Sequence, residues 1–110
     1  MILRIWNGYT TKGNADIYHK LLLEHVFPSI LAKKISGYRK MQLLRKELAE
    51  ETQFTTIMWF DNLQSIIDFV GEDYEQVYVP DEARKVLARF DQKSSHHELI
   101  ETFDYSGETL

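Results

Sequence analysis

A ten-residue run in the middle of the chain, residues 52–61, constrains the fold more than any other stretch. It reads TQFTTIMWFD and is rich in β-branched and aromatic side chains, which favour the pleated surface of a sheet. It carries no charge until Asp61, as expected of a strand that is covered on both faces. We therefore predict a central strand here.

Alternation of apolar and polar residues predicts three further strands. They span residues 2–9, 38–48 and 95–103. The second carries several charges, which oppose further pairing, so we place it at an edge of the sheet. Glu50 and Glu51 lie between it and the central strand, and so short a connection predicts an antiparallel hairpin.

Helices are predicted from apolar stripes and from residues that favour helix ends. Asn14 suits the position before a first helix, Pro28 should bend or break it, and Lys34 marks its end. The stripe of this helix consists of Ile17, Leu21, Leu22, Val26 and Ile30. A shorter helix should follow, capped by Asp61 or Asn62 and ended by Gly71, and another over residues 80–90, opened by a proline.

The elements therefore follow the order strand, helix, strand, strand, helices, strand. This is the split βαβ arrangement of ferredoxin-like folds, so we predict an α+β chain with a four-stranded antiparallel sheet. A length of 110 residues supports one core, and we assign one domain to residues 1–104. Residues 105–110 have no pattern and are predicted to form a tail that frays or reaches a partner.

Composition argues against several classes of function. The net charge is −4, with cations interleaved among anions, which disfavours binding to nucleic acid. The absence of cysteine excludes disulfides and thiol catalysis. No apolar run reaches the roughly 18 residues of a membrane helix, and the first residues lack the pattern of a signal peptide. We expect a cytoplasmic protein that does not bind membranes.

Motifs for metals and cofactors are missing from the sequence. There is no glycine-rich phosphate loop, no HExxH and no dinucleotide fingerprint. His19 and His25 are six residues apart, which does not place two ligands on one helix face. His96 and His97 are adjacent on a strand and must point to opposite faces. We therefore expect neither a metal nor a cofactor.

The predicted sheet has more apolar surface than its helices can cover. Helices on one side leave the other face bare, which is unusual on a monomer. We expect a second copy of the chain to cover this face, sheet against sheet, with an unrelated partner as the alternative. The residues assigned to this interface are Arg4, Trp6, Gln42, Leu44, Met58, Phe60, His96 and Glu98.

Three stretches of the chain resemble a known family. They are ILRIWNGYT at the start, the WFD end of the central strand before a helix that contains Leu63, and the closing SHHEL strand. Together with the order of elements, they are similar to the antibiotic biosynthesis monooxygenases, a family of dimeric α/β barrels. The resemblance covers nearly the whole chain. It implies a homodimer with a cavity between helices and sheet, in which some members oxygenate polyphenolic or quinol-like substrates without a cofactor.

Haem degradation, an activity of related enzymes in the same superfamily, does not fit the sequence. Those enzymes use an asparagine near the end of the first strand, a tryptophan on the helix after the third strand and a histidine on a later helix. Asn7 matches the first position. The helix after Asp61 contains no tryptophan, and no histidine lies between Asp61 and Phe90, so we reject this activity.

The sheet face opposite the predicted interface supplies the candidate site residues. Asn7 would hold an oxygen anion of the substrate, and His97 would take a proton from a phenol. Trp59, Phe54 and Tyr9 would line the substrate pocket. Each residue also has a structural interpretation, as a buried amide bonded to backbone, a core aromatic ring or a satisfied histidine.

The sequence leaves two functions open. The first is a homodimeric oxygenase that acts on an aromatic small molecule. The second is a non-catalytic or accessory protein of the same fold that binds a small apolar ligand, or none. The cavity volume separates them, because an interior filled by Trp59, Phe54 and the helix side chains would leave no room for a substrate.

Overall fold

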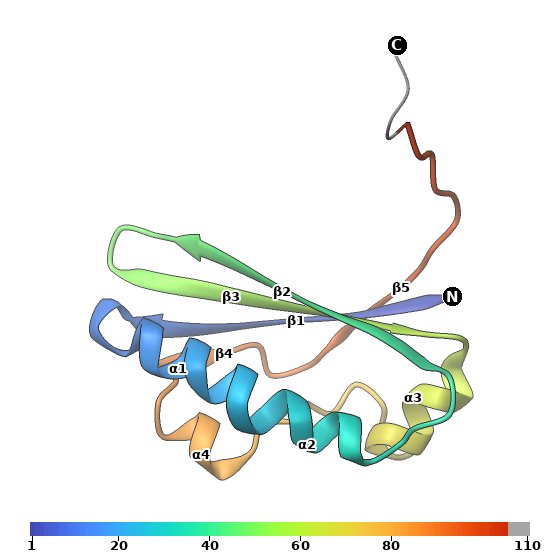
Figure 1. The fold of residues 1–110 in the computed structure, drawn as a ribbon, viewed down its shortest axis with the longest axis horizontal. Helices are drawn as coiled ribbons and strands as arrows, with labels where there is room; N and C mark the ends of the chain where they lie inside the picture. The colour runs from blue at the N-terminus through green and yellow to red at the C-terminus, as the bar shows by residue number, and fades with distance from the viewer. Residues whose placement is uncertain (106–110) are drawn as a thin grey trace.

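A five-stranded antiparallel sheet carries its helices on one face only (Figure 1). The computed structural model describes residues 1–105. The strands are β1 (Ile2–Thr11), β2 (Tyr38–Glu47), β3 (Glu51–Phe60), β4 (Arg89–Phe90) and β5 (Ser95–Glu98). Their order is β2-β3-β1-β4, and β5 also pairs with β1. The predicted α+β, ferredoxin-like arrangement is therefore confirmed, with one strand more than the four expected.

Strand β3 occupies the central position predicted for it. Its pairing with β1 runs without a break from Phe60 opposite Ile2 to Glu51 opposite Thr11. On its other side β3 forms the predicted hairpin with β2, and the Leu48 N–H donates to the Glu51 carbonyl at 2.8 Å in the connection. Strand β2 is an edge strand, as its charges indicated.

The last strand is divided in two and is shorter than predicted. β4 pairs with the end of β1 and β5 pairs with its start. The strand predicted over residues 95–103 stops at Glu98, because this residue is opposite Ile2, where β1 begins. Residues 99–105 form neither strand nor helix, and the predicted tail from residue 106 onward lies outside the described residues.

The helix predicted over residues 80–90 is also shorter. Helix α4 spans Asp81–Arg84, with Pro80 directly before it. The Ala88 N–H donates to the carbonyl of Tyr9 at 2.8 Å, and β4 follows at once. Pairing with β1 therefore takes this segment away from the helix, which a local apolar stripe could not predict.

Three helical segments form one continuous rod along the sheet (Figure 1). They are α1 (Ala15–Leu21), the π-helical segment η2 (Leu22–Val26) and α2 (Phe27–Ala32). Pro28 has no N–H to donate, and the Phe27 N–H immediately before it donates to the Leu22 carbonyl across a wider π-helical turn. The disturbance predicted at Pro28 takes this form, and the helix does not break.

The buried side of this rod is one residue out of step with the prediction at its start. Ile17 is 56% exposed, and Tyr18 takes its place in the core. The buried stripe recurs every four residues and consists of Tyr18, Leu22, Val26 and Ile30.

Within residues 1–105, none of the helices has the length and apolarity to cross a bilayer.

One of the two predicted asparagine caps is confirmed. At the start of α3 (Leu63–Val70), the side-chain oxygen of Asn62 accepts a hydrogen bond from the Ser65 N–H at 3.0 Å. Asn14 makes no capping bond, and its amide instead donates to the Val86 carbonyl at 3.3 Å. A tertiary contact has therefore replaced the expected local one.

On β1 and β3 the two faces of the sheet are the reverse of those predicted, whereas Gln42 and Leu44 of β2 lie on the face away from the helices, as assigned. The helix-facing side chains are buried and include Arg4, Trp6, Phe54, Met58 and Phe60. The face away from the helices carries Leu3, Ile5, Asn7, Tyr9, Thr55, Ile57 and Trp59. Alternation separates two faces without stating which one is inside, and here both are apolar. Within one chain, only one face of residues 52–61 is covered.

Two glycines with positive φ offer a matched test of packing against backbone strain. Gly37 has φ 85° and Gly71 has φ 96°, so alanine is strained at both. A Cβ on Gly37 would also lie 2.1 Å from the Ser65 hydroxyl oxygen, whereas a Cβ on Gly71 would meet nothing within 4 Å. We expect Gly71→Ala to lower the free energy of unfolding by about 1–3 kcal/mol.

Gly37→Ala should lower the free energy of unfolding by roughly 1 kcal/mol or more beyond the effect of Gly71→Ala, because Ser65 must also move. Urea unfolding of the two variants measures the difference. In a Ser65→Gly background, Gly37→Ala should lower the free energy of unfolding by much less than it does in the wild type. If Gly37→Ala and Gly71→Ala lower the free energy of unfolding equally, the packing of Ser65 against Gly37 is contradicted.

Candidate functional site

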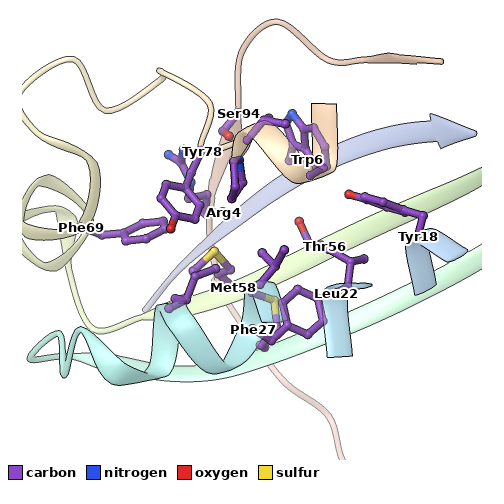
Figure 2. A pocket seen from close by; sticks show the side chains of 16 residues that line it. Arg4, Trp6, Tyr18, Leu22, Phe27, Thr56, Met58, Phe69, Tyr78 and Ser94 are labelled. Atoms are coloured by element: carbon purple, nitrogen blue, oxygen red, sulfur yellow. The ribbon is translucent and has the colours of Figure 1, made fainter. Parts of the chain in front are cut away.

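A cavity lies between the helices and the helix-facing side of the sheet (Figure 2). Its volume is about 50 Å³, and with its opening it includes about 520 Å³ of unfilled space, part of which is open solvent. The walls are mostly apolar and include Trp6, Leu22, Phe27 and Met58. The inner volume suits a few water molecules, whereas sites for drug-sized ligands have about 300–1,000 Å³. A larger ligand would therefore also occupy the opening.

Arg4 brings a charge into this apolar cavity. Its side chain comes from β1, and the residue is only 3% exposed. The guanidinium Nη1 donates to the Tyr74 carbonyl at 2.5 Å, and Nη2 donates to the Gln76 carbonyl at 2.6 Å. Both carbonyls belong to the segment between α3 and α4, so Arg4 fixes this segment over one end of the cavity.

His96 is the third partner of Arg4. Its Nε2 lies 2.9 Å from Nη1 of Arg4, and because arginine can only donate, Nε2 must accept. Burial, with a smaller effect of the Arg4 charge, lowers the pKa of His96 and favours the neutral imidazole that this bond requires. The ring also packs edge-on against Tyr74 at 5.3 Å. His96 therefore orients Arg4.

No carboxylate compensates the Arg4 charge within residues 1–105. Its hydrogen-bond partners are two carbonyls and an imidazole, and it forms no salt bridge with a described residue. Burial lowers the pKa of Arg4 to about 10, which leaves it charged at neutral pH. By contrast, the exposed Arg39 and Arg89 pair with Asp61 and Glu51.

Buried hydroxyl groups also face the cavity. Tyr18 is 1% exposed and lines it, yet its hydroxyl forms no hydrogen bond to any described residue. In Figure 2 this hydroxyl points into the group of lining side chains. Ser94 is buried and also lines the cavity, as does the half-buried Thr56. Burial raises the pKa of Tyr18, so at neutral pH its hydroxyl remains a donor.

Asn7, the predicted oxyanion residue, lies on the other face of the sheet, and both polar atoms of its side chain are hydrogen-bonded to other side chains. Its Nδ2 donates to Asp91 Oδ2 at 2.9 Å. Its Oδ1 accepts from Gln53 Nε2 at 3.0 Å and from Thr55 Oγ1 at 2.5 Å. The structure therefore places Asn7 in a polar network of side chains and not in the cavity.

Three more predicted site residues lie away from the cavity. On the bare face, Trp59 donates to Gln42 Oε1 at 2.8 Å. His97 is exposed, with its Nε2 2.6 Å from the Ser95 hydroxyl oxygen. The guanidinium of Arg89 lies over the Tyr9 ring, with its Cζ 3.7 Å from the ring centroid. These residues are not brought together with Asn7 around any enclosed space.

Phe54 faces the helices as a site residue should, but it belongs to the core. It is fully buried and packs edge-on against Tyr18, with ring centroids 5.0 Å apart. Three residues that were assigned to the subunit interface, Arg4, Trp6 and Met58, line the cavity instead.

Three more interface assignments change, whereas Gln42 and Leu44 do lie on the face away from the helices. Phe60 is in the core, His96 lies beside Arg4, and Glu98 is exposed. Tyr18 and Ser94 were not predicted as site residues. The available signal was Arg4 itself, a single charge between Leu3 and Ile5 in an otherwise uncharged strand.

The arrangement can bind a small ligand but holds no metal cluster. Within residues 1–105, no three His, Asp or Glu side chains come close enough to bind a metal ion. The lining of the cavity includes none of these residue types, so its polar groups are Arg4 and hydroxyls. These groups donate hydrogen bonds, which suits oxygen atoms of a ligand.

Comparison with solved structures gives a match to a protein from Bacillus cereus that is described as a putative antibiotic biosynthesis monooxygenase. The TM-score is 0.56, with 94% of this chain and 96% of the other chain covered. The chain has the fold of that protein. Sequence identity is 9%, so the likeness concerns the fold alone. No family model and no curated protein matches the sequence.

The cavity lies between helices and sheet, as the resemblance of the sequence implied. What differs is its lining. The side chains come from the Arg4, Trp6 and Met58 side of the sheet, opposite to the side that was predicted.

Proposed function

We propose that this chain is an oxygenase of the antibiotic biosynthesis monooxygenase type that holds a small aromatic molecule in the cavity. The observation that carries this proposal is Tyr18, a residue only 1% exposed whose hydroxyl forms no hydrogen bond to a described residue and is directed into a mostly apolar space. An oxygen of a bound ligand would give this hydroxyl the hydrogen-bond partner that the described residues do not supply. The monooxygenase-like fold supports the same function.

The proposed reaction needs no external reductant. A methylene carbon between two aromatic rings loses two hydrogens and gains one oxygen atom of O₂, and the other oxygen atom leaves as water. The substrate supplies all four electrons that reduce O₂. Trp6, Leu22 and Phe27 would contact the aromatic rings, while Tyr18 would donate a hydrogen bond to the oxygen that becomes anionic as a proton is lost.

A non-catalytic binding protein of the same fold is the second candidate. Two observations favour it: the inner cavity measures only about 50 Å³, and no carboxylate or imidazole in its lining could act as a base. A ligand in such a site would be bound by Tyr18 and the apolar walls without being converted.

Oxygen uptake and ligand binding together test these two functions. The wild-type protein is mixed with a panel of anthrone- and quinol-like compounds, and Trp6 fluorescence reports binding because this ring lines the cavity. We expect Tyr18→Phe to weaken binding or slow uptake by about tenfold, the effect of one hydrogen bond. Tyr9→Phe, on the opposite face of the sheet, should match the wild type.

The outcomes separate the proposals. Uptake that depends on Tyr18 supports the oxygenase, and binding without uptake supports the binding protein. Absence of both, or equal behaviour of the wild type and the two variants, would remove the cavity from the function of the protein.

We also propose that the protein is a homodimer joined through the bare face of the sheet. Within one chain, nothing described covers the face that carries Leu3, Ile5, Ile57 and Trp59 (Figure 1). Leu44, on the same face, is 51% exposed. Burying these side chains against a second copy would remove the apolar area from water.

A further inference from the structure

We propose that the cavity binds its ligand through an ionised oxygen, a carboxylate or a phenolate, that Arg4 holds. This inference rests on the proposed function, since it names the class of molecule that the same cavity would take. It concerns the charge of the ligand, which neither the fold nor the apolar walls determine.

The first step is the charge balance around Arg4. A buried cation is stable only if it is paired or bonded by several acceptors. Arg4 has two carbonyls and His96 but no carboxylate among the described residues, although it is 3% exposed. Arg39 and Arg89 have carboxylate partners in far more exposed positions. A ligand anion would supply the charge that is missing at Arg4.

The second step is the set of donors that Arg4 still has. A guanidinium group has five N–H donors. Nη1 uses its two on Tyr74 and His96, and Nη2 uses one on Gln76. The Nε–H and one Nη2–H therefore remain, and neither donates to a described residue. The Nε–Nη2 edge of a guanidinium can bind both oxygens of a carboxylate side by side.

The same pair of donors already binds carboxylates elsewhere in this molecule. Arg39 donates through Nε at 2.9 Å and through Nη2 at 2.6 Å to the two oxygens of Asp61. Arg89 uses Nε and Nη2 on Glu51, at 3.1 Å and 2.8 Å to the same oxygen. Arg4, which lines the cavity, has unused donors on the same two nitrogens that bind a carboxylate at two other arginines.

The third step is the size and lining of the cavity. About 50 Å³ suits a carboxylate or a phenolate oxygen with little else, so the rest of the ligand would lie in the opening beside Phe27 and Tyr78. The buried Tyr18 and Ser94 hydroxyls line the same space and can donate further hydrogen bonds. Repulsion is absent, because no Asp or Glu is among the lining residues.

Benzoate and benzamide test this inference, since they have nearly the same shape and differ in charge. Binding of each to the full chain at pH 7 is measured by Trp6 fluorescence and calorimetry. We expect benzoate to bind at least about tenfold more tightly than benzamide, as a charge-assisted bidentate contact requires. In Arg4→Lys, which keeps the charge but lacks the paired donors, most of this preference should disappear.

Controls keep the result interpretable. Arg84→Lys changes an exposed arginine that donates to the Val79 carbonyl, and the preference should stay as in the wild type. Circular dichroism tests whether Arg4→Lys is folded, because the change also removes bonds to Tyr74 and Gln76. If that variant unfolds, Tyr18→Phe replaces it and should weaken benzoate binding.

Each outcome decides one proposal. Equal affinity for benzoate and benzamide would overturn the anion site and leave the cavity as a ligand site. A benzoate preference that survives in both Arg4→Lys and Tyr18→Phe would place the anion elsewhere and also overturn the inference. If neither these probes nor the anthrone-like compounds bind, the proposed function itself fails.

Discussion

Ile57→Glu is expected to convert the proposed homodimer into a monomer. Ile57 lies at the centre of the bare face, between Ile5 on β1 and Gln42 on β2. In a twofold dimer the change would place two carboxylates in the interface, and a buried unpaired charge costs several kcal/mol. We expect the dissociation constant to rise at least about a hundredfold, as measured by sedimentation at several protein concentrations.

Leu23→Glu is the matched control for this experiment. Leu23 is also an exposed apolar residue, at 53% exposure, but it lies on the helical side of the molecule. The control should keep the mass of the wild type, and both variants should keep the far-ultraviolet spectrum of the folded chain. A wild type that is monomeric at micromolar concentration, or a dimer that tolerates Ile57→Glu, would contradict the proposed interface.

Phe60→Ala should lower the free energy of unfolding by about 3–5 kcal/mol, the usual cost of removing a buried phenylalanine ring. Phe60 ends β3 and is 0% exposed. Its ring packs against Tyr38 at 5.4 Å and against Phe69 at 6.1 Å, so it joins β2 to α3. Urea unfolding at one fixed protein concentration measures the loss, because dimer formation would otherwise shift the midpoint.

Phe103→Ala provides the contrast. Phe103 is 73% exposed in the segment after β5, and its loss should change stability by less than about 0.5 kcal/mol. The contact between Phe60 and Tyr38 allows a second check: Tyr38→Leu should be destabilising, though less than Phe60→Ala, because Tyr38 is partly exposed. Similar losses for Phe60→Ala and Phe103→Ala would contradict the position of Phe60 in the core.

Local patterns predicted most of the elements of this fold. The composition of residues 52–61 was enough to place the central strand, and the charges of β2 indicated an edge. Asn62 and Gly71 were correct as the ends of α3, because capping depends on a few neighbouring residues. The ends of β5 and α4 were wrong, since pairing with β1 determines both.

The site was predicted less well than the fold, and Arg4 shows why. A charged residue in an apolar strand was assigned to a subunit interface, whereas the structure buries it under the segment between α3 and α4. Asn7 was assigned to the cavity because it alternates with Leu3 and Ile5, and it lies on the bare face. Both errors follow from one reversed assignment of faces.

The sequence by itself determined the order of the strands and helices, the central place of β3 and the presence of two apolar sheet faces. Only the tertiary structure decided which face the helices cover, and with it which residues line the cavity. The physical reason is that alternation along a strand has a period of two and is symmetric between its faces. When both faces are apolar, only packing of the helices against one of them breaks that symmetry.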